Sequence, residues 1–386
     1  IAYLMLFVYS AFLSVQVMPF PVYIPFMDPI GEDLRAVINF SYNLFFENQS
    51  PYDKIHPYPP LTNLLAYPLI FIELSTLYKI ITLITISCFV INILIFSSKL
   101  VDEKTPAILI LVLTTGLLSF GLQFELERGQ FNVIAIFLCF VALWLFHYKT
   151  KYRLLAYVLI TLSIQLKVWP LIFIVLFVHE WKDWKTNLKR FALIGAVNFG
   201  LLFVLGRDIF AEYIGALTRH AAGPYYEAKY NHSIKSFLLD SQKTQGRIAV
   251  FIENNFDFLF WALLGITLLC IFYLIFHAYR HNQRALNPQL LLGCTLGALI
   301  ITPTSHDYAL STLAGPAALI LLSEKFWLGF GRLRLKIPAI LMLLTFSSAY
   351  AFTLFSYSYK PSVFGNIFKN NFIPLMVMLV ILTILQ

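Results

Sequence analysis

The sequence predicts an all-α, polytopic integral membrane protein, and its composition and recurring apolar runs carry that prediction. Of its 386 residues, 59% are hydrophobic and 12% are charged, and the mean hydropathy is +0.75. Because a soluble protein carries about 25% charged residues, this composition excludes a soluble domain, a disordered chain and a disulfide-stapled secreted module. A bilayer-spanning helix needs about 20 mostly apolar residues, and such runs recur along the whole chain.

The apolar runs predict about twelve transmembrane helices within one membrane domain, residues 1–386. We expect these spans near residues 1–19, 79–98, 105–122, 130–147, 153–166, 168–181, 191–206, 256–277, 288–304, 307–323, 337–356 and 371–386. A further apolar stretch, 59–76, contains Pro59, Pro60 and Pro68. Because proline interrupts a helix, we interpret this stretch as a half-helix or re-entrant segment that packs against protein.

The basic residues predict the orientation of these spans. Of the 28 Lys and Arg residues, 15 lie in five connectors that would share one side, together with five acidic residues: 99–104, 147–153, 179–190, 278–287 and 324–336. The positive-inside rule places this side in the cytoplasm, and it would fail if 59–76 crossed the membrane. The net charge of +8 therefore indicates orientation, and we expect no nucleic-acid partner.

The outer side would receive two long segments, residues 20–58 and 207–255. A long polar connection between spans is rarely an idle linker. In the first segment, apolar and small residues recur at i, i+3 and i+4 spacing: Leu34, Val37, Ile38, Ser41, Leu44 and Phe45. This pattern predicts an amphipathic helix over about 33–47, either on the outer membrane surface or packed on the spans.

Several unusual polar residues collect on the predicted outer face. They include Asp33, Arg128, Gln130, Asn132, Lys167, Asn231, His232 and His306. Ionisable groups near membrane depth are costly, so they are functional candidates. The ordinary alternatives are a helix N-cap for Asp33 and snorkelling for Arg128 and Lys167. For His306 the alternative is a satisfied interface histidine. We expect Glu125 and Glu127 to be solvated or paired with Arg128.

These residue types suit one kind of chemistry. Arg and Lys hold an anionic phosphate where solvation is poor, and a carboxylate can accept a proton from an attacking hydroxyl. Together with an apolar groove for a hydrocarbon tail, they suit sugar transfer from a lipid phosphate to a hydroxyl, with inversion of the anomeric centre. The alternatives are a lipid-linked oligosaccharide flippase or transporter, and a ligase that uses a polyprenyl-diphosphate donor. A flippase should show polar residues along several spans and inverted-repeat halves, whereas here the polar residues collect at one face.

A succession of short motifs runs along residues 28–310. Its members are Asp33-Leu34, Ser50-Pro51-Tyr52-Asp53, His56-Pro57-Tyr58-Pro59-Pro60-Leu61, Glu127-Arg128-Gly129-Gln130-Phe131-Asn132, Leu166-Lys167-Val168-Trp169-Pro170-Leu171 and Asn231-His232-Ser233. In order and spacing, this succession resembles glycosyltransferase family 87, the polyprenol-phosphate-mannose-dependent mannosyltransferases of the GT-C fold.

The resemblance implies a substrate pair and a set of roles. The donor would be a sugar, mannose before others, on a polyprenyl phosphate, and the acceptor a lipid-linked glycan or glycolipid. Transfer would invert the anomeric centre on the extracytoplasmic side of the plasma (inner) membrane, without nucleotide sugar, cofactor or metal. Asp33 would act as the base, with Glu32 as the alternative. Arg128 and Lys167 would bind the donor phosphate.

The resemblance also implies which residues surround the donor sugar. Tyr58, Gln130 and His306 would line this part of the site. Asn132, Asn231 and His232 are further candidates.

Overall fold

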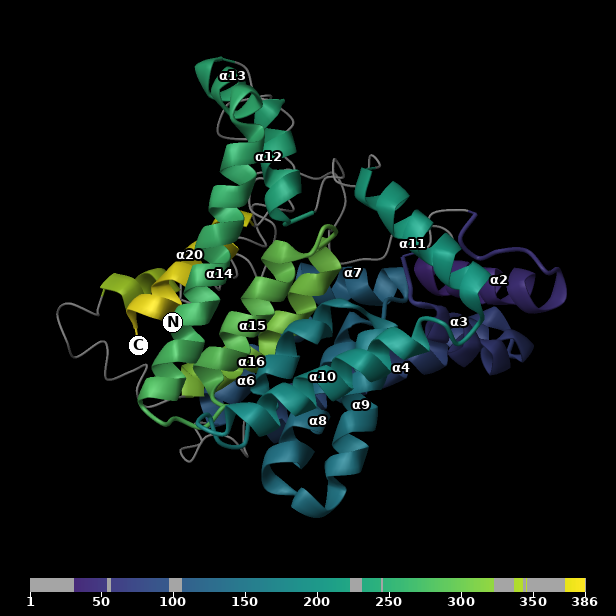
Figure 1. Cartoon of the computed structure of the whole chain (residues 1–386), viewed down its shortest axis with the longest axis horizontal. Coiled ribbons are helices and arrows are strands. Elements are labelled where there is room, and N and C mark those ends of the chain that lie inside the picture. Colours follow the sequence, from purple (N-terminus) through teal and green to yellow (C-terminus); the bar gives the residue numbers. More distant parts are fainter. Residues whose placement is uncertain are drawn as a thin grey trace. The chain divides into compact units, whose positions relative to one another are not determined.

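The structure of the chain is a computed structural model that describes residues 31–53, 57–96, 106–222, 231–243, 246–322, 337–342, 345 and 372–385. All elements named within these residues are helices (Figure 1). The predicted span 1–19 and most of 337–356 lie outside the described residues. The predicted all-α class is thus confirmed for the part of the chain that the structure describes.

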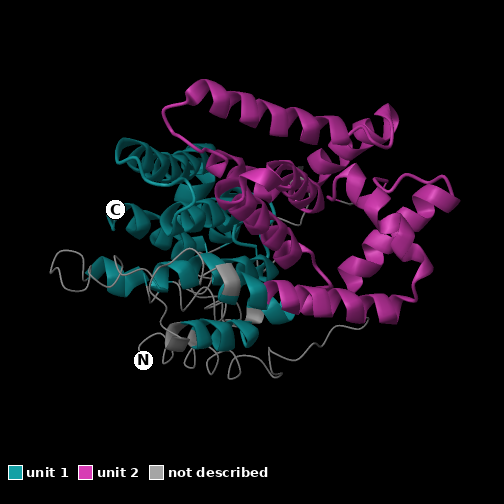
Figure 2. Cartoon of the chain, turned by 90° about the horizontal axis from the view of Figure 1, so that it is seen from below, with its two compact units in different colours: residues 1–25, 90–124, 224–386 teal, residues 26–89, 125–223 magenta. Residues whose placement is uncertain are grey.

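The chain divides into two compact units (Figure 2). The first unit comprises residues 1–25, 90–124 and 224–386, and the second comprises 26–89 and 125–223. One membrane domain over residues 1–386 stays a prediction.

The second unit is built from α-helices and short 3-10 helices: α2 (Glu32–Phe46), α3 (Pro60–Ala66), η1 (Tyr67–Phe71), α4 (Leu74–Ile91), α8 (Asn132–Tyr148), η3 (Thr150–Tyr152), α9 (Arg153–Leu166), η4 (Trp169–Leu176), α10 (Trp184–Leu201) and α11 (Arg207–Ala222). Helix α7 (Phe120–Arg128) passes from the first unit into the second. Helices α8 and α9 pack against each other, and the Ser163 hydroxyl donates to the Ala135 carbonyl oxygen at 2.7 Å.

The core of the first unit consists of two almost fully buried helices, α15 (Pro288–Ile301) and α16 (Ala314–Leu322). The other elements of this unit are η2 (Asn92–Phe96), α6 (Pro106–Leu117), α12 (Ile234–Gln242), α13 (Arg247–Asn254), α14 (Phe256–Arg280), η6 (Asp307–Leu313) and α20 (Phe372–Ile384). All nine residues of α16 are buried, as is the interior of α15. Helices α14 and α20 cover α15, and α6 covers α16.

Two described helices are long and apolar enough to cross a membrane, Leu74–Leu94 and Phe256–Arg280. A third span results if Gly121–Arg128 and Asn132–Tyr148, which meet at a bend of 108°, count as one. Other predicted spans form shorter helices; α9 has 14 residues. The apolar helices fit a membrane protein, and the number of twelve spans stays a prediction.

The amphipathic helix predicted over about 33–47 is confirmed as α2. Leu34 and Val37 are buried in a cluster with Tyr58, Leu77 and Phe131. The apolar face of α2 therefore packs on protein, which is the second of the two arrangements that its periodicity allowed.

Most of the stretch 59–76 forms two short helices, α3 and η1, over residues 60–71, and its last residues begin α4 at Leu74. Pro60 occupies the first turn of α3, where the missing N–H group has no helical partner to lose. Twelve helical residues are too few to cross about 30 Å of hydrocarbon at 1.5 Å each. This length fits the predicted half-helix.

Candidate functional site

The candidate site begins where α2 meets the turn between α7 and α8. The Gly31 N–H donates to the Glu127 carbonyl oxygen at 2.7 Å. Gly31 and Gly129 both have left-handed backbones, with φ of 76° and 65°, which glycine adopts at little cost. A Cβ at Gly129 would lie 2.9 Å from the Leu34 Cβ and 3.4 Å from the Gly31 Cα. The two backbones can therefore approach this closely because glycine stands at the contact.

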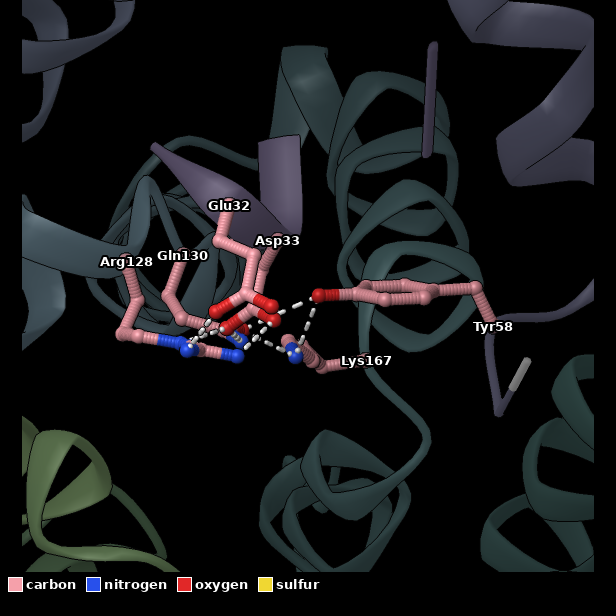
Figure 3. A network of polar contacts seen from close by, with 6 residues as sticks. All are labelled: Glu32, Asp33, Tyr58, Arg128, Gln130 and Lys167. Carbon is pink, nitrogen blue, oxygen red and sulfur yellow. Dashed lines mark hydrogen bonds and ion pairs between the residues drawn. The ribbon is translucent and has the colours of Figure 1, made fainter. Parts of the chain in front are cut away.

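This approach places Asp33 opposite Arg128 (Figure 3). Arg128 donates from Nε to Asp33 Oδ2 at 2.8 Å and from Nη2 to Asp33 Oδ1 at 2.6 Å, and its Nη1 donates to Glu32. Gln130 Nε2 also donates to Asp33 Oδ2. Such a bidentate pair fixes both planar groups. Asp33 is partly exposed, with 21% of its side-chain surface accessible.

The N-cap interpretation of Asp33 is wrong. Gly31 is the N-cap of α2, and Asp33 lies in the first turn of the helix. The carboxylate is directed to Arg128 and Gln130 instead. Its position near the helix N-terminus still favours the negative charge.

Lys167 and Tyr58 join the same network through Gln130 (Figure 3). Gln130 Oε1 accepts from the Tyr58 hydroxyl at 3.0 Å and from Lys167 Nζ at 2.6 Å. Lys167 Nζ also donates to the Tyr58 oxygen at 2.9 Å and lies 4.3 Å from the centroid of its ring. Five predicted residues from separate parts of the second unit are thus linked by hydrogen bonds: Asp33, Tyr58, Arg128, Gln130 and Lys167.

Burial lowers the pKa of Lys167 to about 8, while the Glu125 and Asp33 carboxylates act in the opposite direction. Lys167 lies between two predicted spans, at the end of α9. At neutral pH it is still mainly an ammonium ion. Together with Arg128 it supplies the positive charge of the site.

The interpretation of Glu125 as solvated or paired with Arg128 is wrong. Glu125 is fully buried. Its Oε2 accepts from Asn132 Nδ2 at 2.9 Å and its Oε1 from the Val133 N–H at 3.0 Å, at the start of α8. Asn132 Oδ1 accepts from Trp169 Nε1 at 3.2 Å. Asn132 therefore supports the junction near Lys167, and Glu125 holds Asn132.

Glu127 is buried as well, with 5% of its surface accessible, so it is not solvated. A glutamate shortly before a helix start is the sequence signal that could have identified Glu125, because acidic groups are favoured at helix N-termini.

The remaining candidates, Asn231, His232 and His306, belong to the first unit. Asn231 and His306 form an isolated antiparallel bridge. Asn231 Oδ1 accepts from the Ser305 N–H at 3.0 Å. His232 Nε2 lies 2.7 Å from Asp307 Oδ1, and both side chains are fully buried.

Asp307 is a residue that sequence reasoning did not select. The buried partner of His232 is Asp307, whereas the neighbouring His306 is partly exposed. The structure thus brings the three candidates of the first unit together, where the segment that precedes α12 pairs with the segment that precedes η6. A role of His306 at the donor sugar stays a prediction.

The network of the second unit combines a carboxylate that can accept a proton with two cations that can bind an anion. Among the described residues, no three His, Cys, Asp or Glu side chains are grouped to hold a metal ion. The expectation of a reaction without cofactor or metal stays a prediction.

Comparison with known proteins identifies the family. The sequence model of the family described as glycosyltransferase family 87 matches residues 56–303 of the chain. These residues include Tyr58, Arg128, Gln130 and Lys167. No curated protein and no solved structure matches the chain. Because the match covers more than half of the sequence, the chain belongs to glycosyltransferase family 87.

Proposed function

We propose that this glycosyltransferase moves a single sugar, with mannose as the first candidate, from a polyprenyl phosphate to a hydroxyl of a lipid-linked glycan or glycolipid. The reaction inverts the anomeric centre at the extracytoplasmic face of the plasma membrane. The observation that carries the proposal is one carboxylate, Asp33, joined to two cations, Arg128 and Lys167, through direct and Gln130-mediated hydrogen bonds. The basic connectors support the orientation.

Asp33 acts as the general base in this proposal. The acceptor hydroxyl gives its proton to a carboxylate oxygen of Asp33, and its oxygen attacks the anomeric carbon. The bond between that carbon and the phosphate oxygen breaks, and its electron pair leaves with the polyprenyl phosphate. One carboxylate base and a stabilised leaving group are sufficient for such a displacement.

Arg128 and Lys167 stabilise the phosphate as it leaves. In the structure the Arg128 guanidinium is shared between Asp33 and Glu32. A donor phosphate competes with both carboxylates for this group, because Arg binds phosphate in the same bidentate manner as carboxylate. Donor binding therefore loosens Asp33 from Arg128 when the base is needed.

Tyr58 and Gln130 present a hydroxyl and an amide beside Asp33, so they are the groups of this network that suit the hydroxyls of a sugar. His306 is proposed as a further group on the donor side. Asn132 does not contact the donor in this proposal; it stabilises the site through its hydrogen bonds with Glu125 and Trp169.

The test is turnover by purified Asp33→Asn enzyme with a polyprenyl-phosphate mannose and a lipid extract as acceptor. We expect transfer to fall by about 10²–10⁴-fold, with an unchanged melting temperature in detergent. The matched control is Glu32→Gln, which removes the adjacent carboxylate and should retain most activity. Normal turnover by Asp33→Asn would show that Asp33 is not the base.

A donor screen tests the substrate class. Polyprenyl-phosphate sugars should serve directly, whereas UDP- and GDP-sugars should not. Direct turnover with a nucleotide sugar would overturn the lipid donor. Transfer of a whole glycan from polyprenyl diphosphate, in the absence of transfer from the monophosphate, would replace this proposal with the ligase reaction.

A further inference from the structure

Tyr52 makes contacts on several sides with its neighbours in the structure, and it lies in the long segment 20–58. It is fully buried, and its hydroxyl donates to the carbonyl oxygen of Tyr58 at 2.9 Å. Asn63 of α3 donates from Nδ2 to the same hydroxyl at 3.3 Å, and Ser41 of α2 donates to Asn63 at 3.5 Å. The Tyr52 hydroxyl therefore links the backbone of Tyr58 to two helices of the site.

Helix α11 holds Tyr52 from the other side. Arg219 Nη2 donates to the Tyr52 carbonyl oxygen at 2.6 Å, and the Tyr213 ring lies 5.3 Å from the Tyr52 ring. Ser50 donates to Glu212 and accepts from the Tyr52 N–H at 3.1 Å. Since Glu212 and Arg219 are seven residues apart, they share one face of α11, and this face holds residues 50–52.

We infer that Tyr52 is a positioning residue of the transfer reaction, which acts through Tyr58 and couples α11 to the donor site. The route runs from Arg219 to Tyr52, to the Tyr58 backbone, and from the Tyr58 hydroxyl to Lys167 and Gln130. All of these residues belong to the second unit. The role in catalysis rests on the proposed function, whereas the positioning of Lys167 does not.

A hydroxyl in this place is a stable donor. Burial and the neighbouring Tyr213 raise the pKa of Tyr52 above its ordinary value, so Tyr52 keeps its proton throughout the usual pH range. A phenylalanine would fill almost the same volume and would remove the bond to the Tyr58 carbonyl and the bond from Asn63. Tyr52→Phe is therefore a conservative test of the link.

The readout is the ionisation of Lys167. The Tyr58 oxygen accepts from the Lys167 ammonium and so favours the charged form. The charged and titratable groups that face Lys167 are Glu125 and Asp33, which favour the ammonium, and His220 on α11. If Tyr58 drifts, Lys167 loses an acceptor, and its titration moves to lower pH.

The experiment measures the rate at which an amine-reactive reagent acylates Lys167 as a function of pH, by peptide mass spectrometry of the full chain in detergent. No substrate is required. Tyr52→Phe should move the midpoint of this titration down by about one pH unit, the order expected for one lost bond to an ammonium. Tyr58→Phe should move it at least as far, and the double variant no further than Tyr58→Phe.

Two matched controls separate positioning from packing. Tyr213→Phe removes a buried hydroxyl from the same pair of rings and should leave the Lys167 titration unchanged. Arg219→Ala should move the midpoint in the direction of Tyr52→Phe, whereas Arg207→Ala, at the other end of α11, should not.

An unchanged Lys167 midpoint in folded Tyr52→Phe would overturn the inference, even if stability fell. Equal and additive shifts from Tyr52→Phe and Tyr58→Phe would overturn it too, because additivity indicates independent effects. A shifted midpoint together with normal turnover by Asp33→Asn would leave the positioning intact and remove the proposed role of Asp33 as the base.

Discussion

The contact between Gly129 and α2 gives the sharpest prediction for the construction of the site. Substituting Gly129→Ala places a Cβ 2.9 Å from the Leu34 Cβ and 3.4 Å from the Gly31 Cα, in a backbone with φ of 65°. A left-handed backbone costs a non-glycine residue about 1–2 kcal/mol, and forced overlap in a packed interior about 1–3 kcal/mol. We expect Gly129→Ala to lower the free energy of unfolding by about 2–5 kcal/mol in total.

The same substitution should reduce activity, because relief of the overlap moves Leu34 and Gly31 away from the turn. Asp33 lies between these two residues, so its bidentate bonds to Arg128 would lengthen. We expect sugar transfer to fall by about 10²-fold, which is the cost of a misplacement near 1 Å. The assay combines unfolding in detergent with turnover of the purified enzyme.

Two other glycines separate the contributions. Gly246 has φ of 103° and ψ of −167°, a backbone region almost restricted to glycine, and nothing lies within 4 Å of its Cβ position. Gly246→Ala therefore measures backbone strain without an overlap, about 1–3 kcal/mol. Gly195, inside α10, also has open space, and Gly195→Ala should gain about 0.5–1 kcal/mol. Both should retain turnover. If Gly129→Ala behaves like Gly246→Ala in stability and keeps full turnover, the glycine contact does not position Asp33.

Three further outcomes follow from the charged residues. Because the pKa of Lys167 is about 8, kcat/KM should fall as pH rises through this value and Lys167 loses its charge. Lys167→Arg, whose guanidinium stays protonated throughout the accessible pH range, should remove this alkaline limb. A limb that stays would identify another group. Glu125→Ala removes the acceptor of Asn132 and Val133 and should cost about 1–3 kcal/mol in thermal unfolding, more than Glu125→Gln, which keeps one oxygen. His232→Ala removes a partner of the buried Asp307 side chain and should cost about 3 kcal/mol, the upper end of the cost of leaving a buried acceptor unpaired. The cap variant Ser233→Ala should cost about 1 kcal/mol. Equal losses would contradict a special role for the pair.

Local patterns in the sequence predicted much of the helical structure. The i, i+3, i+4 spacing from Leu34 to Phe45 corresponds to α2, and the apolar run 153–166 has the same bounds as α9. These features depend on residues within a few turns of one another, and such residues determine the periodicity of a helix. Where the pattern was apolar throughout, it was less informative: the run 168–181 forms the 3-10 helix Trp169–Leu176, because composition alone does not specify helix type or length.

The sequence allowed us to predict which residues belong to the candidate site, but not which of them contact each other. Asp33, Arg128 and Lys167 were selectable because charged residues are scarce in so apolar a chain. The pairing of Asp33 with Arg128 joins positions 95 residues apart, and no local pattern encodes such a contact. Asp307 was missed for the same reason, since its importance depends on burial and on the distant His232. Glu125 was considered but misinterpreted: its partners, Asn132 and Val133, are close in sequence, whereas its complete burial could not be read from a local pattern.

The negative charge that the phosphate gains during the reaction explains why Asp33 should take up a proton in the same step. Without substrate, the carboxylates of Glu32 and Asp33 pair with Arg128, and those of Glu125 and Asp33 favour the charged form of Lys167. A sugar phosphodiester adds one negative charge, and its cleavage to a phosphate monoester adds a second. If Asp33 takes the acceptor's proton in the same step, it becomes neutral, and the net charge of the site does not change during the reaction. An enzyme with Asp33→Asn lacks this compensation, so the proposed displacement would have to place the additional negative charge in a partly buried site, where unpaired charge is costly.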